Sequence, residues 1–306
     1  EDMSSRGWFE IVTSKDYSYL NSKRVVEACL NCKSCRTICP AGVDVSDLIL
    51  KRRAEQPNFM AGLIFRLHAQ GWLFEPLLKA LAVTQRLWDR PTPRAWLERL
   101  TRPFMRRIAE TARIPREMVL PRLAVRHLRD RHPELTRQAA SGQKRTVAYF
   151  HGCAANYLDD GVGDAVIAVL RRHGVEPALP PQRCSGTPIQ TYGHVELVLQ
   201  QARFNLASLT PYDRVVTGCA SCTLMLKDYP QLFADGPERA AAERLAKKVK
   251  HISEFVAESE TAPVLQQGAV VSRQKVTYHS SCHLRAAGVV KPPRQVLAGL
   301  PGVELV

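Results

Sequence analysis

Residues 29–40 read CLNCKSCRTICP and place four cysteines within eleven positions. The pattern C-x2-C-x2-C-x3-C-P is a spacing by which a short loop binds iron–sulfur clusters, because neighbouring thiolates can reach different irons. Thiols this close together are poorly placed for ordinary disulfide pairing, and zinc sites prefer two separated C-x2-C pairs. The segment therefore predicts a [4Fe-4S] site whose ligands are Cys29, Cys32, Cys35 and Cys39.

The same pattern leaves the ligand set incomplete. In proteins with two such motifs, the fourth cysteine of one run ligates the cluster of the other run. By that rule Cys39 serves a second cluster, and the first three cysteines need a ligand from elsewhere. A second run of this kind does not occur in the sequence. We expect either a further motif before Glu1, which is the preferred hypothesis, or a distant cysteine that completes one cluster.

A second set of cysteines follows predicted β-strands. Val147–Phe150 and Arg214–Thr217 are short apolar strands, and a cysteine comes shortly after each of them. In open α/β sheets the loops at the carboxyl ends of parallel strands form the ligand crevice. The start of a helix, where Cys219-Ala-Ser-Cys222 lies, favours thiolates. We therefore predict a further iron–sulfur cluster bound by Cys153, Cys184, Cys219 and Cys222.

The chain divides into three regions. Residues 1–53 hold the dense cysteine run and predict a helical, ferredoxin-like 4Fe-4S domain. Residues 54–142 form a basic helical linker, a candidate for membrane or partner docking. Residues 143–306 alternate short strands with amphipathic helices, among them an expected edge strand at 175–179 and an expected helix over 190–209. This alternation indicates βαβ units and a parallel sheet. The predicted fold class is thus α+β and α/β.

An internal repeat marks the third region. Val147–Cys153 matches Val276–Cys282, and Gly-Val-Glu follows the next helix in both copies. The first repeat spans 143 to about 260 and the second, incomplete one about 270–306. Cys282 is therefore a possible cluster ligand of the second repeat, and we expect the natural protein to continue past Val306.

Charge and composition narrow the class of protein. The formal net charge is +14, and residues 51–145 carry 21 Lys and Arg against 8 Asp and Glu. Such an excess suits an acidic partner, an anionic membrane or nucleic acid. Here the basic residues lie among Leu, Trp and Phe at helical spacing, so a nucleic-acid partner is not expected. Nine cysteines without a secretion signal indicate the cytoplasm and metal binding rather than disulfides.

Two stretches of the middle region are apolar. Phe59–Phe65 and Trp72–Leu78 are interspersed with basic residues and could form an interfacial helix on a membrane. Packing against the chain's own domain or a partner subunit is the preferred interpretation. No apolar run is long enough to span a bilayer.

Three histidines flank the cysteines, namely His151, His279 and His283. Each could tune a potential or relay a proton, although a hydrogen-bonded loop residue is the preferred interpretation. The sequence has no Gly-rich dinucleotide fingerprint and no P-loop, so no flavin or nicotinamide site is visible.

With these motifs in hand, the chain resembles the CCG-domain family related to heterodisulfide reductase. Members include the iron–sulfur subunits of anaerobic glycerol-3-phosphate dehydrogenase, glycolate oxidase and lactate utilisation. Residues 29–43 are similar to the second of two ferredoxin motifs in these proteins, and Asp2–Gly7 looks like the linker after the first. Residues 150–157 and 219–225 resemble the opening and close of the first CCG repeat, and Tyr278–Leu284 resembles the opening of the second.

The resemblance implies an electron-transfer subunit. Its partners would be a flavoprotein dehydrogenase of a small hydroxylated metabolite, such as glycerol 3-phosphate, glycolate or lactate, and a membrane quinone or cytochrome. Its location would be cytoplasmic, peripheral on the inner face of the cytoplasmic membrane. The chain would be the electron-transfer part of an oxidoreductase complex with at least one, and by expectation two or more, [4Fe-4S] clusters.

One departure from the family pattern bears on mechanism. The Cys-Cys-Gly signature here reads Cys184-Ser185-Gly186, and in heterodisulfide reductase the extra thiolate belongs to a non-cubane cluster. The site could hold a cubane, a three-iron cluster, a non-cubane cluster with a serine ligand, or none. This departure argues against a disulfide-reducing role for this half of the repeat. A heterodisulfide reductase-like, disulfide-reducing enzyme is the alternative function that the resemblance implies, and a nucleic-acid-binding protein with a structural cluster is a second alternative.

Overall fold

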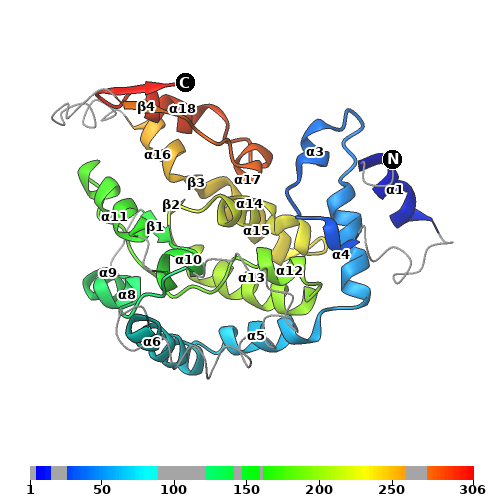
Figure 1. Cartoon of the computed structure of the whole chain (residues 1–306), viewed down its shortest axis with the longest axis horizontal. Coiled ribbons are helices and arrows are strands. Elements are labelled where there is room, and N and C mark those ends of the chain that lie inside the picture. Colours follow the sequence, from blue (N-terminus) through cyan, green and yellow to red (C-terminus); the bar gives the residue numbers. More distant parts are fainter. Residues whose placement is uncertain (1–4, 15–25, 89–120, 141–146, 159–160, 260–273) are drawn as a thin grey trace.

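The computed structural model describes residues 5–14, 26–88, 121–140, 147–158, 161–259 and 274–306 (Figure 1). Part of the predicted N-terminal linker (1–4) and much of the basic segment (89–120) lie outside the described residues. The elements in chain order are α1 (Ser5–Thr13), α3 (Ser34–Ile38), α4 (Val45–Glu55), α5 (Phe59–Ala69), α6 (Gly71–Trp88), α8 (Leu128–Arg131), α9 (Pro133–Ala140), β1 (Val147–Phe150), α10 (Gly152–Tyr157), α11 (Val162–Arg172), α12 (Thr187–Thr191), α13 (Val195–Leu209), β2 (Arg214–Thr217), α14 (Ala220–Asp228), η1 (Tyr229–Leu232), α15 (Pro237–Lys248), β3 (Val249–His251), α16 (Ile252–Glu258), β4 (Gln274–Val276), α17 (Cys282–Ala286), α18 (Lys291–Ala298) and β5 (Val303–Leu305).

A three-stranded parallel sheet forms the centre of the third region. The strand order is β1-β2-β3, and Phe150 is paired in register with Thr217. The strands are short and almost wholly buried, as expected for a parallel sheet covered on both faces. In coarse terms, the prediction of a mixed helical protein with parallel sheets is confirmed.

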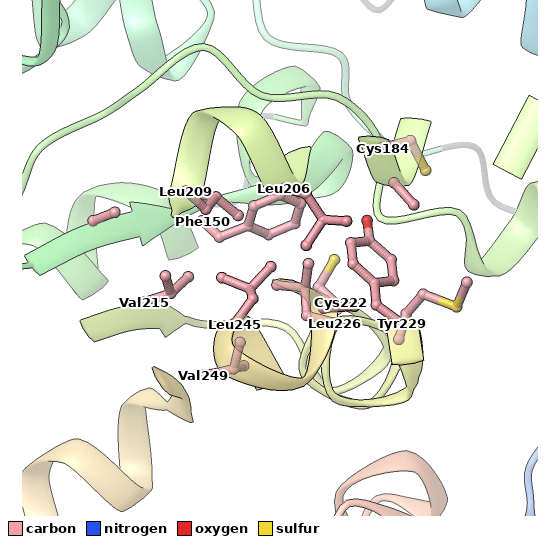
Figure 2. Packing of buried hydrophobic residues seen from close by; sticks show 14 of the residues in the cluster. Phe150, Cys184, Leu206, Leu209, Val215, Cys222, Leu226, Tyr229, Leu245 and Val249 are labelled. Atoms are coloured by element: carbon pink, nitrogen blue, oxygen red, sulfur yellow. The ribbon is translucent and has the colours of Figure 1, made fainter. Parts of the chain in front are cut away.

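Alternation along the strands gives each face of the sheet its own core. Ala148 and Phe150 point into one cluster with Val215 and Val249, where residues of α13, α14 and α15 cover them (Figure 2). Val147 and Tyr149 point into the opposite cluster, which α11 and α16 cover. This two-residue period follows from strand geometry. The sheet edge that carries the cysteines is thereby held between two packed layers.

Several predicted elements differ in their bounds. The helix expected over 190–209 is broken into α12 and α13, because Gly193 adopts a φ of 85° between them. The strand expected at 175–179 is reduced to a single parallel bridge between Ala148 and Ala178, since Pro177 has no amide hydrogen to donate to a ladder.

The C-terminal part forms a sheet of its own. Strands β4 and β5 are parallel to one another and belong to a sheet separate from β1-β2-β3. The order β4, α17, α18, β5 is the same as the order β1, α10, α11 and the bridge at Ala178. A repeat would give this order, and the repeat itself stays a prediction.

The N-terminal lobe, comprising α1, α3 and α4, packs against the rest of the described chain through α3 and α4 (Figure 1). Buried Arg53 donates to the carbonyls of Val26 (3.0 Å) and Cys29 (2.7 Å) and, across the junction, to that of Thr191 (2.9 Å). A Cβ on Gly193 would come within 2.4 Å of the Arg53 carbonyl oxygen. The two lobes therefore meet with backbone against backbone.

Helices α5 and α6 run along the opposite side of the sheet domain from β4 and β5 (Figure 1). Among the helices that the structure describes, none combines the length and the apolar character needed to cross a membrane.

Candidate functional site

The N-terminal cysteines lie around one cavity. Its volume is about 700 Å³, and all four cysteines of the 29–40 run contribute to its wall, together with Trp8 and Phe9 of α1. Asn31 and Lys33 have φ angles of 53° and 59°, which residues other than glycine seldom adopt. These two left-handed residues alternate with the cysteines and turn the loop tightly. The Asn31 amide donates to Cys29 Sγ at 3.4 Å.

The cysteines of this loop have different environments. Burial raises the pKa of Cys29. Burial alone would also raise the pKa of Cys32, but hydrogen bonds from the Ser34 hydroxyl and amide outweigh it and lower that pKa. Amide and hydroxyl donors to sulfur are features of cluster-binding loops, where they tune the reduction potential. The loop thus fits the predicted iron–sulfur cluster, while its individual ligands stay predictions.

The second set of cysteines comes together from loops that are far apart in sequence. Cys153 lies on α10, directly after β1, and Cys219 caps α14, directly after β2. Cys222 lies in the first turn of α14, and Cys184 lies in the loop before α12. The chain therefore gathers all four at the carboxyl ends of the strands, where the sequence placed them.

Hydrogen bonds join these four cysteines in two pairs. The Cys222 thiol and the amides of Cys222 and Ser221 donate to Cys219, which lowers the pKa of Cys219 to about 6. The hydrogen bond to Cys219 and complete burial raise the pKa of Cys222. A hydrogen bond from the Cys184 thiol likewise lowers the pKa of Cys153. One member of each pair is thus favoured as thiolate, the form that ligates metal.

Ser185 and Gly152 both lie against Cys222. Ser185 is buried, and its side chain hydrogen-bonds to Cys222. Gly152 has a φ of 68°, and a Cβ there would lie 2.8 Å from Cys222 Sγ. The serine that departs from the family signature therefore lies among the cysteines, with an oxygen available as a possible ligand.

The four thiols do not converge as they would around a single ion. Within the described ranges, no three His, Cys, Asp or Glu side chains gather closely enough to hold one metal ion. In a four-iron cluster each cysteine binds a separate iron, so the ligands surround a larger volume.

His283 connects the two cysteine sites. Its Nε2 donates to the Asn31 carbonyl at 2.9 Å, and its Nδ1 accepts from the Ser221 hydroxyl at 2.8 Å. Asn31 lies between Cys29 and Cys32, and Ser221 lies between Cys219 and Cys222. Nearby, Arg36 of α3 pairs with Asp228 of α14 at 3.2 Å. In the sequence His283 stands beside Cys282, and no local pattern reveals its contact with Asn31 across 252 positions.

The remaining predicted residues are placed as follows. Cys282 begins α17, which packs against both α3 and α14, next to the two sites. His151 is buried, its Nδ1 donates to the Gly152 carbonyl at 2.7 Å, and burial lowers its pKa to about 4. His279 is exposed on the loop after β4.

Comparison with known proteins places the chain in a family. The profile described as CCG, cysteine-rich domain, matches residues 147–227, the span of the second cysteine set. No solved structure matches the chain. The chain is 35% identical over 162 residues to lactate utilization protein A of Bacillus velezensis, covering 52% of this chain and 67% of that protein.

Two further relatives match this chain over a stretch of similar length. Lactate utilization protein A of Shouchella clausii is 35% identical over 162 residues, with 52% of this chain and 66% of that protein covered. A fumarate reductase (CoM/CoB) subunit of Methanothermobacter marburgensis is 35% identical over 163 residues, and the chain covers only 30% of its length. The matched span, its cysteines and their placement at the strand ends show that the chain belongs to the CCG cysteine-rich domain family.

Proposed function

We propose that this chain is an iron–sulfur electron-transfer subunit of an oxidoreductase complex. The observation that carries the proposal is the adjacency of two cysteine sites joined by His283, which bonds to the Asn31 carbonyl and to the Ser221 hydroxyl. A relay requires redox groups held close together in fixed positions. The relatives' names, lactate utilization and fumarate reductase, support an oxidoreductase role.

Cys29, Cys32, Cys35 and Cys39 would hold one site, and Cys153, Cys184, Cys219 and Cys222 the other, with Cys282 as a possible further ligand. Bound clusters would supply one-electron redox chemistry. The chain's own residues fix the loops: Arg53 holds the Cys29 carbonyl at 2.7 Å, and helix α14 directs its first amides at Cys219. The domain bounds 1–53, 54–142 and 143–306 remain part of this proposal.

The finer assignment concerns the partners. A flavoprotein would oxidise a small hydroxylated metabolite of the glycerol 3-phosphate, glycolate or lactate class, and electrons would leave toward a membrane quinone or cytochrome. The chain would be cytoplasmic and peripheral on the membrane, which the exposed apolar residues of α5 and α6 support.

The test is anaerobic purification followed by iron and acid-labile sulfide analysis and low-temperature EPR of the oxidised and reduced forms. We expect two or more reducible clusters per chain. Little iron, or stoichiometric zinc, would contradict the proposal.

Disulfide reduction is the second candidate, and it depends on Ser185. The support for this candidate is the name of one relative, fumarate reductase (CoM/CoB). Ser185 places an oxygen beside Cys222 where the family signature has a thiol. An unusual high-g EPR signal on oxidation would favour disulfide reduction over the relay.

A further inference from the structure

A polar cavity lies beside the second cysteine set and between two regions of the chain. Its volume is about 190 Å³, and Cys153 and Cys184 form part of one wall. The middle region also contributes to the lining, where His68 lies in the last turn of α5 and Glu75 lies on α6. Cys219 and Cys222 do not line it, so the cavity lies to one side of the four cysteines.

Three side chains around this cavity have a buried nitrogen without a partner. His68 Nδ1, Arg129 Nε and His151 Nε2 form no hydrogen bond within the part of the chain that the structure describes. Buried polar atoms are nearly always paired, and each exception calls for an explanation such as a bound molecule. Three exceptions around one cavity therefore indicate a ligand site with polar recognition.

The cavity lining carries charges of both signs, Glu75 against Arg129 and Arg183. Glu75 faces it and accepts a hydrogen bond from the Tyr157 hydroxyl at 3.5 Å. This carboxylate would repel an anion and offsets the charge of Arg129, and the Arg183 guanidinium stacks on the Phe204 ring, 4.3 Å from its centroid. Burial lowers the pKa of His68, so the imidazole is neutral near pH 7. A neutral molecule with carbonyl oxygens can accept hydrogen bonds from Arg129 and a histidine without this repulsion.

Exposed apolar side chains are concentrated on α5 and α6, the two helices that contribute to the cavity wall. Nine of the 17 exposed large hydrophobic residues within the described ranges lie on α5 and α6. One of them, Trp72, is 78% exposed and directly follows Gly71 of the cavity wall. Exposed apolar surface concentrated on two helices marks an interaction site. The other eight are Phe59, Met60, Leu63, Ile64, Leu73, Leu77, Leu81 and Val83.

From these observations we propose that the cavity binds the ring of a lipid-soluble quinone, with the apolar tail along α5 and α6. This inference rests on the proposed function and deepens it, because it assigns the electron acceptor to a place in the fold. A quinone combines the two properties that the site calls for, a neutral ring with two carbonyl acceptors and a lipophilic tail. Its ring would lie next to Cys153 and Cys184.

The test measures binding directly on the full, cluster-loaded chain. The probe is 2-heptyl-4-hydroxyquinoline N-oxide, a quinone analogue whose fluorescence is quenched on binding. We expect saturable binding, competed by a short-chain quinone. Arg129→Gln and His68→Phe should each raise the Kd about tenfold or more, because a hydrogen bond to a buried polar group is lost. His68→Phe keeps the ring packing on Phe74 and Tyr157.

The matched control is Arg126→Gln, which changes an exposed arginine outside the cavity lining. Its Kd should equal that of the parent chain. Circular dichroism and iron content of every variant identify a folding defect, and two independent variants keep the test decisive if one misfolds.

Unchanged Kd values in both folded variants, an absence of saturable binding, or displacement by sulfate or malonate rather than by quinones would overturn the inference. The two proposals fail separately. Reducible clusters without probe binding would refute the quinone site alone, whereas probe binding to a chain that holds no iron would refute the electron-transfer function.

Discussion

The two cysteine sites are built in opposite ways. The N-terminal site comes from twelve consecutive residues, with turns made by Asn31 and Lys33. Its four cysteines line a cavity of about 700 Å³. The second site is assembled from loops between residues 153 and 222, and its cysteines belong to or pack against the core on one face of the sheet. A local motif is specified by its own spacing, whereas the distributed site exists only once the sheet has formed.

The largest expected difference between the sites follows from replacing one cysteine in each. Cys32→Ser should remove the N-terminal cluster and leave the other EPR signal unchanged, and Cys222→Ser should do the reverse. On the iron-free chain, Cys222→Ser should lower the free energy of unfolding by about 1–3 kcal/mol, because a hydroxyl is buried in place of a thiol. Cys32→Ser should change it by less than about 0.5 kcal/mol.

Iron analysis, EPR and urea unfolding are the measurements for this pair. Loss of both EPR signals from either variant would show that the sites depend on one another and are not built separately.

The next largest effect concerns the junction of the two lobes. Arg53→Leu should lower the free energy of unfolding by about 3 kcal/mol or more, because buried carbonyls of Val26, Cys29 and Thr191 lose a charged donor. Lys51→Leu is the matched control, since the Lys51 side chain is 72% exposed and its pairing with Asp47 contributes little. Equal unfolding midpoints in urea for the two variants would contradict the role assigned to Arg53.

The smallest effect tests the bridge between the sites. His283→Ala removes the hydrogen bonds to Asn31 and Ser221, a loss of about 1 kcal/mol each. Amide hydrogen exchange around residues 31–33 should accelerate roughly fivefold or more, while exchange in β1 and β2 stays unchanged. His279→Ala, at an exposed histidine in the loop that precedes α17, should have no effect. Unchanged exchange at Asn31 would show that His283 does not restrain this loop.

Sequence patterns predicted the short-range features well. Strands Val147–Phe150 and Arg214–Thr217 are confirmed, because continuous apolar runs bounded by turn residues are characteristic of buried parallel strands. The break at Gly193 was not predicted; there the Arg53 backbone lies against the glycine and leaves no room for a side chain. That contact joins segments about 140 positions apart, and no local pattern contains it.

By itself, the sequence determined that each of the two sets of cysteines suits iron–sulfur chemistry, since thiolate spacing and strand position are properties of the local chain. Tertiary structure alone decided that Ser185 lies beside Cys222, that His283 joins the two sites, and that α5 and α6 close a polar cavity beside Cys153. The physical reason is that burial, charge compensation and hydrogen-bond partners come from packing between distant segments.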